Sequence, residues 1–228
     1  MGVLVNFILI VVPGTLGLLI HSGIPVNLNE RLMEAIGIAV FGIAIAGIIQ
    51  NENQLVMILS LVIGTFIGEM IDIDKHIRKG VNVVSRKFVR GGGEGADKFS
   101  TGFVSATMIF CIGSLAILGP LESGLTGSNT TLYLKSIFDS VTSILLASSL
   151  GIGVVFAAIP VVVIESAIIL LSRVVAPYLP PVVITEIVAV GSILLFGMGL
   201  NLLNITKLKV MNFTPAMIMP VILVPLLG

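Results

Sequence analysis

Long apolar stretches separated by short polar breaks dominate the chain. A membrane-crossing helix needs about 20 mainly apolar residues, because each residue rises about 1.5 Å through a hydrocarbon core about 30 Å thick. The segments that approach this length are 2–20, 32–50, 54–73, 99–119, 133–150, 152–173, 182–203 and 213–227. The first seven are long enough to span. The last is short and carries Pro215, Pro220 and Pro225, which predicts either a distorted span or a re-entrant segment.

The composition indicates that lipid is the main solvent of the protein. Of its 228 residues, 56% are hydrophobic and 11% are charged, whereas about 25% of the residues in an ordinary soluble domain are charged. The predicted fold class is therefore all-α, a polytopic transmembrane helical bundle of about eight spans. Twelve basic and twelve acidic residues cancel, which gives no reason to expect a nucleic-acid partner. The single Cys111 excludes an intrachain disulfide and any CxxC motif, and we expect no cofactor.

Positive charges gather in one connection, and this predicts the orientation of the chain. Residues 75–98 hold seven of the twelve Lys and Arg residues, which marks this loop as cytoplasmic. The loop is either a solvated linker or a dedicated site for anionic lipid or a partner. With eight spans, ten cations fall on the cytoplasmic side and only Lys135 and Arg173 on the other, so both termini are predicted to lie outside. The apolar N-terminal segment lacks the basic start of a signal peptide, and we interpret it as a retained helix.

An internal repeat is indicated by features that recur in the same order. The stretch GTLGLL at 14–19 resembles GSLAIL at 113–118, and each is followed by a polar loop, a helix rich in small residues and an apolar helix with one carboxylate, Glu69 or Glu165. The predicted divisions of this one membrane domain are 1–74 (first repeat, three helices), 75–98 (basic cytoplasmic loop), 99–175 (second repeat, three helices) and 176–228 (C-terminal pair). The predicted orientation makes the two repeats inverted, an arrangement typical of secondary transporters with midplane sites.

Asp139 is the leading candidate for a site at membrane depth. An ionised side chain at the bilayer centre costs at least about 2.5 to 3.5 kcal/mol, so it needs a partner or a watery cavity. Helical spacing puts Ser136 and Ser140 near Asp139 on a polar stripe, and Lys135 can reach it from four residues away. The group is either a cation or proton site, with a monovalent cation at Asp139, or an internal pair that holds helices together.

Further polar residues are candidates for the same site. Glu165 lies near the middle of its segment, five residues after Pro160, and is either a proton-linked group or a neutral, hydrogen-bonded acid. Glu69 lies close to the basic loop and is either an interfacial acid or a ligand. Neutral ligands could come from Asn6, Asn201 and Asn212, and for Asn201 a hydrogen bond between helices is the alternative.

Small residues indicate where helices approach one another closely. Gly64 and Gly68 lie four residues apart, a spacing that brings two backbones together in membranes, and Gly113 is a further candidate for helix packing. Common catalytic motifs are absent from the sequence, which has no HExxH and no GxSxG, so we expect no enzyme. The chain also has no TVGYG-like filter of the potassium-channel type.

Six stretches over nearly the whole chain carry a family resemblance. They are GVLVN at 2–6, GTFIGE at 64–69, FCIGSLAILG at 110–119, KSIFDS at 135–140, GLNLL at 199–203 and NFTPA at 212–216. They resemble the DUF554 family of bacterial inner-membrane proteins, whose function is undefined and some of whose members carry the label "possible sodium channel or pump". The resemblance implies a multi-pass protein of the bacterial cytoplasmic membrane. The family often has a Tyr-Gln-Gly-like triplet in place of Ile164-Glu165-Ser166, which favours Asp139 over Glu165 as the site.

The leading hypothesis is a small secondary transporter or ion-conducting protein for a cation or a small polar solute. The path would lie between the inverted repeats, with Asp139 binding or exchanging the coupling cation and Lys135 setting its charge. Membrane lipid and a second copy of the chain, in a homodimer, are the other expected partners. The alternative hypothesis is a non-transporting membrane scaffold or sensor that acts through the basic loop.

Overall fold

A computed structural model describes residues 1–20, 26–76, 79, 94–111 and 114–227. Within these ranges the regular elements are all helical, as the sequence predicts. They are α1 (Gly2–Leu19), α2 (Val26–Ile48), α3 (Gln54–Ile71), α5 (Glu94–Cys111), α6 (Ser114–Thr126), α7 (Thr130–Leu150), α8 (Gly153–Phe156), α9 (Ala158–Val175), η1 (Ala176–Tyr178), α10 (Pro181–Leu202), η2 (Val210–Met217) and α11 (Met219–Leu227). Most of the predicted basic loop and Gly113 lie outside the described residues.

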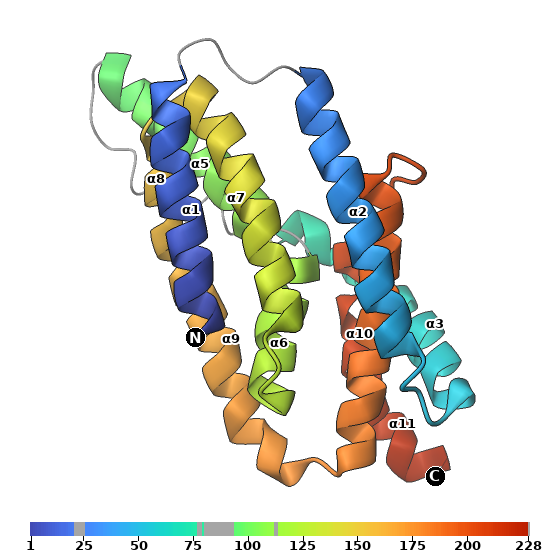
Figure 1. Ribbon diagram of the computed structural model, residues 1–228. Coiled ribbons are helices and arrows are strands. Elements are labelled where there is room, and N and C mark those ends of the chain that lie inside the picture. The colour runs from blue at the N-terminus through green and yellow to red at the C-terminus, as the bar shows by residue number, and fades with distance from the viewer. Residues whose placement is uncertain (21–25, 77–78, 80–93, 112–113, 228) are drawn as a thin grey trace.

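The long helices lie alongside one another in two groups, and successive long helices run in opposite directions (Figure 1). Helices α1, α5, α8 and α9 surround one core, which includes Ile10 and Phe110. Helices α2, α10 and η2 surround a second core that includes Val40. Helix α7 contributes Leu134 to the second core and Ala147 to the first, so it joins the two groups.

Five described helices are long and apolar enough to cross a membrane, or up to seven if each of two bent pairs is one span. Helix α7 is not among them, because it carries Lys135, Asp139 and eight Ser or Thr residues. Its polar side chains face other helices rather than lipid: nine of its residues are buried, Lys135 and Asp139 among them. The exposed positions of α7 include Tyr133 and Ile137, so this helix turns its charged side chains inward and a largely apolar face outward.

Two of the predicted spans are bent. The segment 99–119 is not one straight helix, because α5 ends at Cys111, α6 begins at Ser114 and the two axes differ by 52°. A segment that is apolar on all sides gives no periodic signal for such a change of axis. The C-terminal segment is divided into η2 and α11, whose axes differ by 42°, in agreement with the distorted or re-entrant segment that its prolines predict.

Two glycines allow η2 to approach α3 closely. A Cβ atom on Gly64 would lie 2.2 Å from the Cα atom of Ala216, and one on Gly68 would lie 1.7 Å from the carbonyl oxygen of Asn212. Both distances are far below van der Waals contact, so larger residues would push the two helices apart. On α2, by contrast, a Cβ on Gly42 would meet nothing within 4 Å.

The Gly68→Ala variant is expected to lower the free energy of unfolding by about 1 to 3 kcal/mol, because the added methyl group overpacks a backbone contact. Gly42→Ala is the matched control and should be neutral or stabilising by up to about 1 kcal/mol, since Ala favours helix over Gly. Thermal unfolding in detergent can be followed with a thiol-reactive fluorogenic dye, because its one target, Cys111, is buried. Equal midpoint temperatures for the two variants would contradict this packing.

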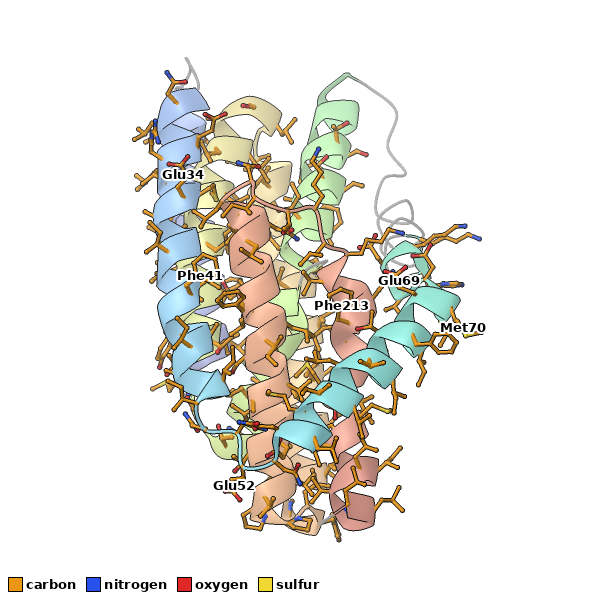
Figure 2. The ribbon with its side chains drawn as sticks, turned by 90° about the vertical axis from the view of Figure 1, so that its right-hand side faces the viewer. Glu34, Phe41, Glu52, Glu69, Met70 and Phe213 are labelled. Atoms are coloured by element: carbon orange, nitrogen blue, oxygen red, sulfur yellow. The ribbon has the colours of Figure 1, made fainter. Side chains whose placement is uncertain are left out.

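A buried carboxylate on α10 holds the turn between α2 and α3. Glu186 accepts hydrogen bonds from the backbone N–H groups of Glu52 (2.9 Å) and Asn53 (2.8 Å) and from Asn51 Nδ2 (2.5 Å). Asn53 in turn caps α3, since its side-chain oxygen accepts from the N–H groups of Leu55 and Val56. The start of α3 is thereby tied to α10, at the end of α3 opposite Glu69 (Figure 2).

Candidate functional site

Four polar side chains from three helices meet inside the first group of helices. They are Asn6 on α1, Lys135 and Asp139 on α7, and Glu165 on α9, and we call them the buried charge cluster. Their exposed fractions are 0, 2, 1 and 1%, so all four are enclosed by protein. At about 1.5 Å per residue, Asp139 lies roughly 14 Å along α7 from Thr130 and Glu165 lies near the middle of α9, which puts both carboxylates at membrane depth.

Close packing of α1 on α7 brings Asn6 into this cluster. The buried face of α1 repeats every four residues, with Gly2, Asn6, Ile10 and Gly14 in turn. A Cβ on Gly14 would lie 2.6 Å from Ser143 Oγ, so a larger residue there would displace the Ser143 side chain. Ser143 Oγ also donates to the carbonyl oxygen of Ile10 at 2.8 Å.

Lys135 lies between the two carboxylates of the cluster. Its Nζ donates to Asp139 Oδ2, one helical turn away, and lies 3.2 Å from Glu165 Oε1. Asn6 Nδ2 donates to the same Glu165 oxygen at 2.7 Å. One ammonium group and one amide therefore join α1, α7 and α9.

The charges and hydrogen bonds of the cluster do not balance. With all three ionisable groups charged, one cation faces two anions, which leaves a net charge of −1. Glu165 Oε2 and Asn6 Oδ1 are buried acceptors with no hydrogen-bond donor among the described residues. Buried polar atoms are seldom left unpaired, because each one costs about 1 to 3 kcal/mol. The cluster could therefore bind one more positive charge or hydrogen-bond donor, although its side chains are not exposed to solvent.

The cluster lies close to the bend between α5 and α6. Cys111, the last residue of α5, is buried and lies within electrostatic range of Lys135, Asp139 and Glu165. Spans that break near the midplane often place their half-helix ends at the binding sites of transporters. Sequence reasoning gave Cys111 no role, since a lone cysteine in an apolar run carries no spacing signal.

Two cavities lie elsewhere and are lined mainly by apolar side chains. One of about 550 Å³ lies between α1 and α9 beside Phe7 and Ile159, and one of about 250 Å³ lies beside Leu125 and Val221. No member of the buried charge cluster lines either of them. The four side chains of the cluster are at most 2% exposed, so neither of these two cavities opens onto them.

The other predicted site residues lie apart from the cluster or serve local structure. Ser136 Oγ donates to the carbonyl oxygen of Leu132 on its own helix (2.8 Å), and Ser140 is half-buried. Asn201 folds the connection after α10, where it donates to the carbonyl of Leu208 and accepts from the N–H of that residue, each at 2.8 Å. Glu69 is exposed near the end of α3 that is remote from the turn at Glu52 (Figure 2).

Asn212 belongs to a separate polar contact, at the C-terminal end of α3. Its Oδ1 accepts from the N–H of Asp74 at 2.8 Å, and its Nδ2 donates to Asp72 Oδ1 at 3.4 Å. Desolvation raises the pKa of Asp72, but the bond from Asn212 and the charge of Lys209, 3.8 Å away, outweigh it and hold this pKa below its ordinary value. The carboxylate form of Asp72 therefore supports the contact, which weakens as the pH falls through this lowered pKa.

No group of three or more His, Cys, Asp or Glu residues that could hold a metal ion occurs in the part of the chain that the structure describes. Around Asp139, the position of a cation is taken by the ammonium group of Lys135. The Lys135 side chain thus serves as the cation of the cluster, and one further positive charge would make the cluster electrically neutral.

The helical bundle, its apolar outer surface and the charged groups enclosed at depth define a polytopic α-helical membrane protein. A family model described as "Protein of unknown function (DUF554)" matches residues 1–225, and the chain belongs to this family. It is 32% identical over 227 residues to "Uncharacterized membrane protein YdfK" of Bacillus subtilis (strain 168), which covers 98% of this chain and 95% of that protein.

A second relative is "Uncharacterized protein YqgA" of Escherichia coli (strain K12). The identity is 27% over 219 residues, with 96% of this chain and 93% of that protein covered. No solved structure matches the chain. The relatives therefore support a membrane protein and say nothing of what it moves or binds.

Proposed function

We propose that the protein is a small secondary transporter or ion-conducting protein for a cation or small polar solute, with the buried charge cluster as its site. The observation that carries this proposal is the position of Lys135 between Asp139 and Glu165 inside the bundle. Each charge at membrane depth costs at least about 2.5 to 3.5 kcal/mol, so three of them together are an expensive means of joining helices. Polar groups in such positions commonly mark the paths of ions and protons.

The bend beside the cluster also supports transport. Alternating access needs an element that can move, and two packed half-helices can change their relative angle more easily than one continuous helix. The closed cluster corresponds on this view to an occluded state, from which α5 and α6 would open a path to one side at a time.

The proposed orientation follows from the charges and from the directions of the helices. Both termini lie in the lower half of Figure 1, as an even number of passes requires. If each bent pair is one span and α7 is counted with them, the chain crosses eight times. On this proposal both termini face outward and the basic loop lies on the cytoplasmic side of a bacterial inner membrane. The inverted repeat of 1–74 and 99–175 stays a prediction.

Asp139→Asn is expected to reduce cation-dependent flux more than tenfold in proteoliposomes while the protein stays in the membrane, because the variant neutralises the partner of Lys135. Flux of H⁺, Na⁺ and K⁺ down imposed gradients can be followed with ion-sensitive dyes enclosed in the vesicles. Glu34→Gln is the matched control, since Glu34 lies on the surface of α2 in a pair with Arg31. Undiminished flux through Asp139→Asn would rule out the assigned site, and absence of any flux through the unmodified protein would rule out ion transport.

A further inference from the structure

The second carboxylate of the cluster has a bonding pattern that differs from that of the first. Asp139 lies four residues after Lys135 on α7, and its Oδ2 atom accepts a hydrogen bond from Lys135 Nζ. This pair is therefore formed within one helix. Glu165 reaches the same ammonium group from α9, at 3.2 Å, and shares its Oε1 atom between Lys135 and Asn6. Its Oε2 atom has no donor among the described residues although the side chain is 1% exposed.

These contacts divide the cluster into a neutral ion pair, Lys135 with Asp139, and one additional anion, Glu165. Lys135 and Asp139 cancel one another, whereas Glu165 is left with an amide and a share of an ammonium group. An isolated carboxylate that is buried in a low-dielectric interior is costly, and the usual remedy is to take up a proton. The charge of the cluster then changes from −1 to zero without any movement of Lys135.

A metal cation fits the same place poorly. The ammonium group of Lys135 lies within hydrogen-bond distance of both carboxylates and would repel a second cation held there. A metal ion also needs several oxygen ligands around it, whereas a proton needs one lone pair and no cavity. Glu165 Oε2 offers such a lone pair in a cluster that is closed to solvent.

We propose, resting on the function given above, that the coupling ion is a proton and that Glu165 carries it on Oε2. In this step an O–H bond of a hydronium ion breaks and a new O–H bond forms on the carboxylate, which leaves a water molecule and a neutral carboxylic acid. The reverse step releases the proton to the other side when the cluster opens there. Lys135 and Asp139 stay paired throughout and act as positioning residues, and Asn6 holds Glu165 Oε1 from α1.

The groups that act on Glu165 come from each helix around it. Helix α7 contributes Lys135 and Asp139 and α1 contributes the uncharged Asn6, while the Cys111 thiol of α5 lies within electrostatic range of Glu165. Helix α8 has no titratable residue, and on α6 Glu122 accepts a hydrogen bond from Thr131 instead. The surplus negative charge therefore rests on Glu165, since Lys135 and Asp139 cancel one another.

Infrared spectroscopy of the whole protein in lipid vesicles tests this assignment without reference to flux. A buried carboxylic acid absorbs apart from a carboxylate and from an acid that is hydrogen-bonded to water, so a pH titration should show one band of buried acid that forms and disappears reversibly. Labelling with ¹³C-glutamate should shift the band, and ¹³C-aspartate should not. The band should be lost in Glu165→Gln and kept in Glu186→Gln, which removes a buried carboxylate on another helix.

Two results would overturn the assignment: a band that moves with ¹³C-aspartate, or a band that persists in Glu165→Gln. The labelling needs no variant, so it remains decisive if Glu165→Gln fails to fold, and the absence of any titrating glutamic acid band would also refute it. Flux measured on the same vesicles separates this assignment from the proposed function. If Glu165 titrates but no flux is seen, the proton site stands and the proposed transport function is refuted. If Na⁺ flux is seen that is independent of pH, transport stands and the proton as coupling ion is refuted.

Discussion

Replacing Lys135 with methionine is expected to lower the free energy of unfolding by about 3 to 5 kcal/mol, the cost of leaving a buried ion pair without one partner. Methionine keeps the length and apolar stem of the side chain but leaves Asp139 and Glu165 facing each other without a cation. The fall in the midpoint of unfolding can be read from the reaction of Cys111 with a fluorogenic thiol reagent in detergent. Lys207→Met is the matched control, because Lys207 is exposed and its loss should change stability by less than about 1 kcal/mol.

A second substitution shows whether charge or packing is responsible. In the double variant Lys135→Met, Asp139→Leu, the internal pair is replaced by apolar groups, and most of the lost stability should return. Glu165 can then take a proton and keep its bond from Asn6. If the double variant were less stable than Lys135→Met alone, the pair would owe its effect to shape rather than to charge.

Glu186→Ala is expected to destabilise the protein by about 2 to 5 kcal/mol, because it leaves two backbone N–H groups and one amide without their acceptor. The effect should be centred on the start of α3, so amide hydrogen exchange near Asn53 should accelerate more than exchange in α9. Glu186→Gln keeps one side-chain acceptor and should lose less stability than Glu186→Ala.

Glu34→Ala is the matched control for this variant. Its carboxylate is partly exposed in a pair with Arg31, and such pairs contribute about 0 to 1 kcal/mol. A loss for Glu186→Ala no larger than that for Glu34→Ala would show that water can replace the three bonds. Faster exchange spread evenly over all helices would show that the contact supports the whole bundle rather than the turn.

Most of the fold could be predicted because apolar length is a strong signal. The predicted limits of the first, third and seventh spans differ by no more than two residues from α1, α3 and α10. The bend between α5 and α6 could not be found in this way, because both halves are apolar and hydropathy does not record direction. Helix α7 could be predicted as a span from its length, although Lys135, Asp139 and its Ser and Thr residues leave it less apolar than the five helices that are apolar enough to span.

The candidate site could be predicted in part. The pairing of Lys135 with Asp139 follows from helical spacing, and it is present in the structure. The convergence of Asn6 and Glu165 on that pair depends on which helices are neighbours, and no spacing along the chain encodes this. Asn201 and Asn212 are as polar as Asn6, yet each bonds to a connection between helices, because α10 and η2 pack around the second core rather than around the cluster.

The hydrogen bond between Asn6 and Glu165 has a consequence for the way the protein is made. The two residues are 159 positions apart, so at about 5 to 20 residues per second the ribosome takes roughly 8 to 30 s to reach Glu165 after Asn6. During that time the Asn6 amide of α1 has no bond to α9, and the glycines of α1 stay uncovered until α7 is made. Another protein must therefore contact the polar and glycine face of α1 until α7 and α9 emerge, and we expect the membrane-insertion machinery to do this.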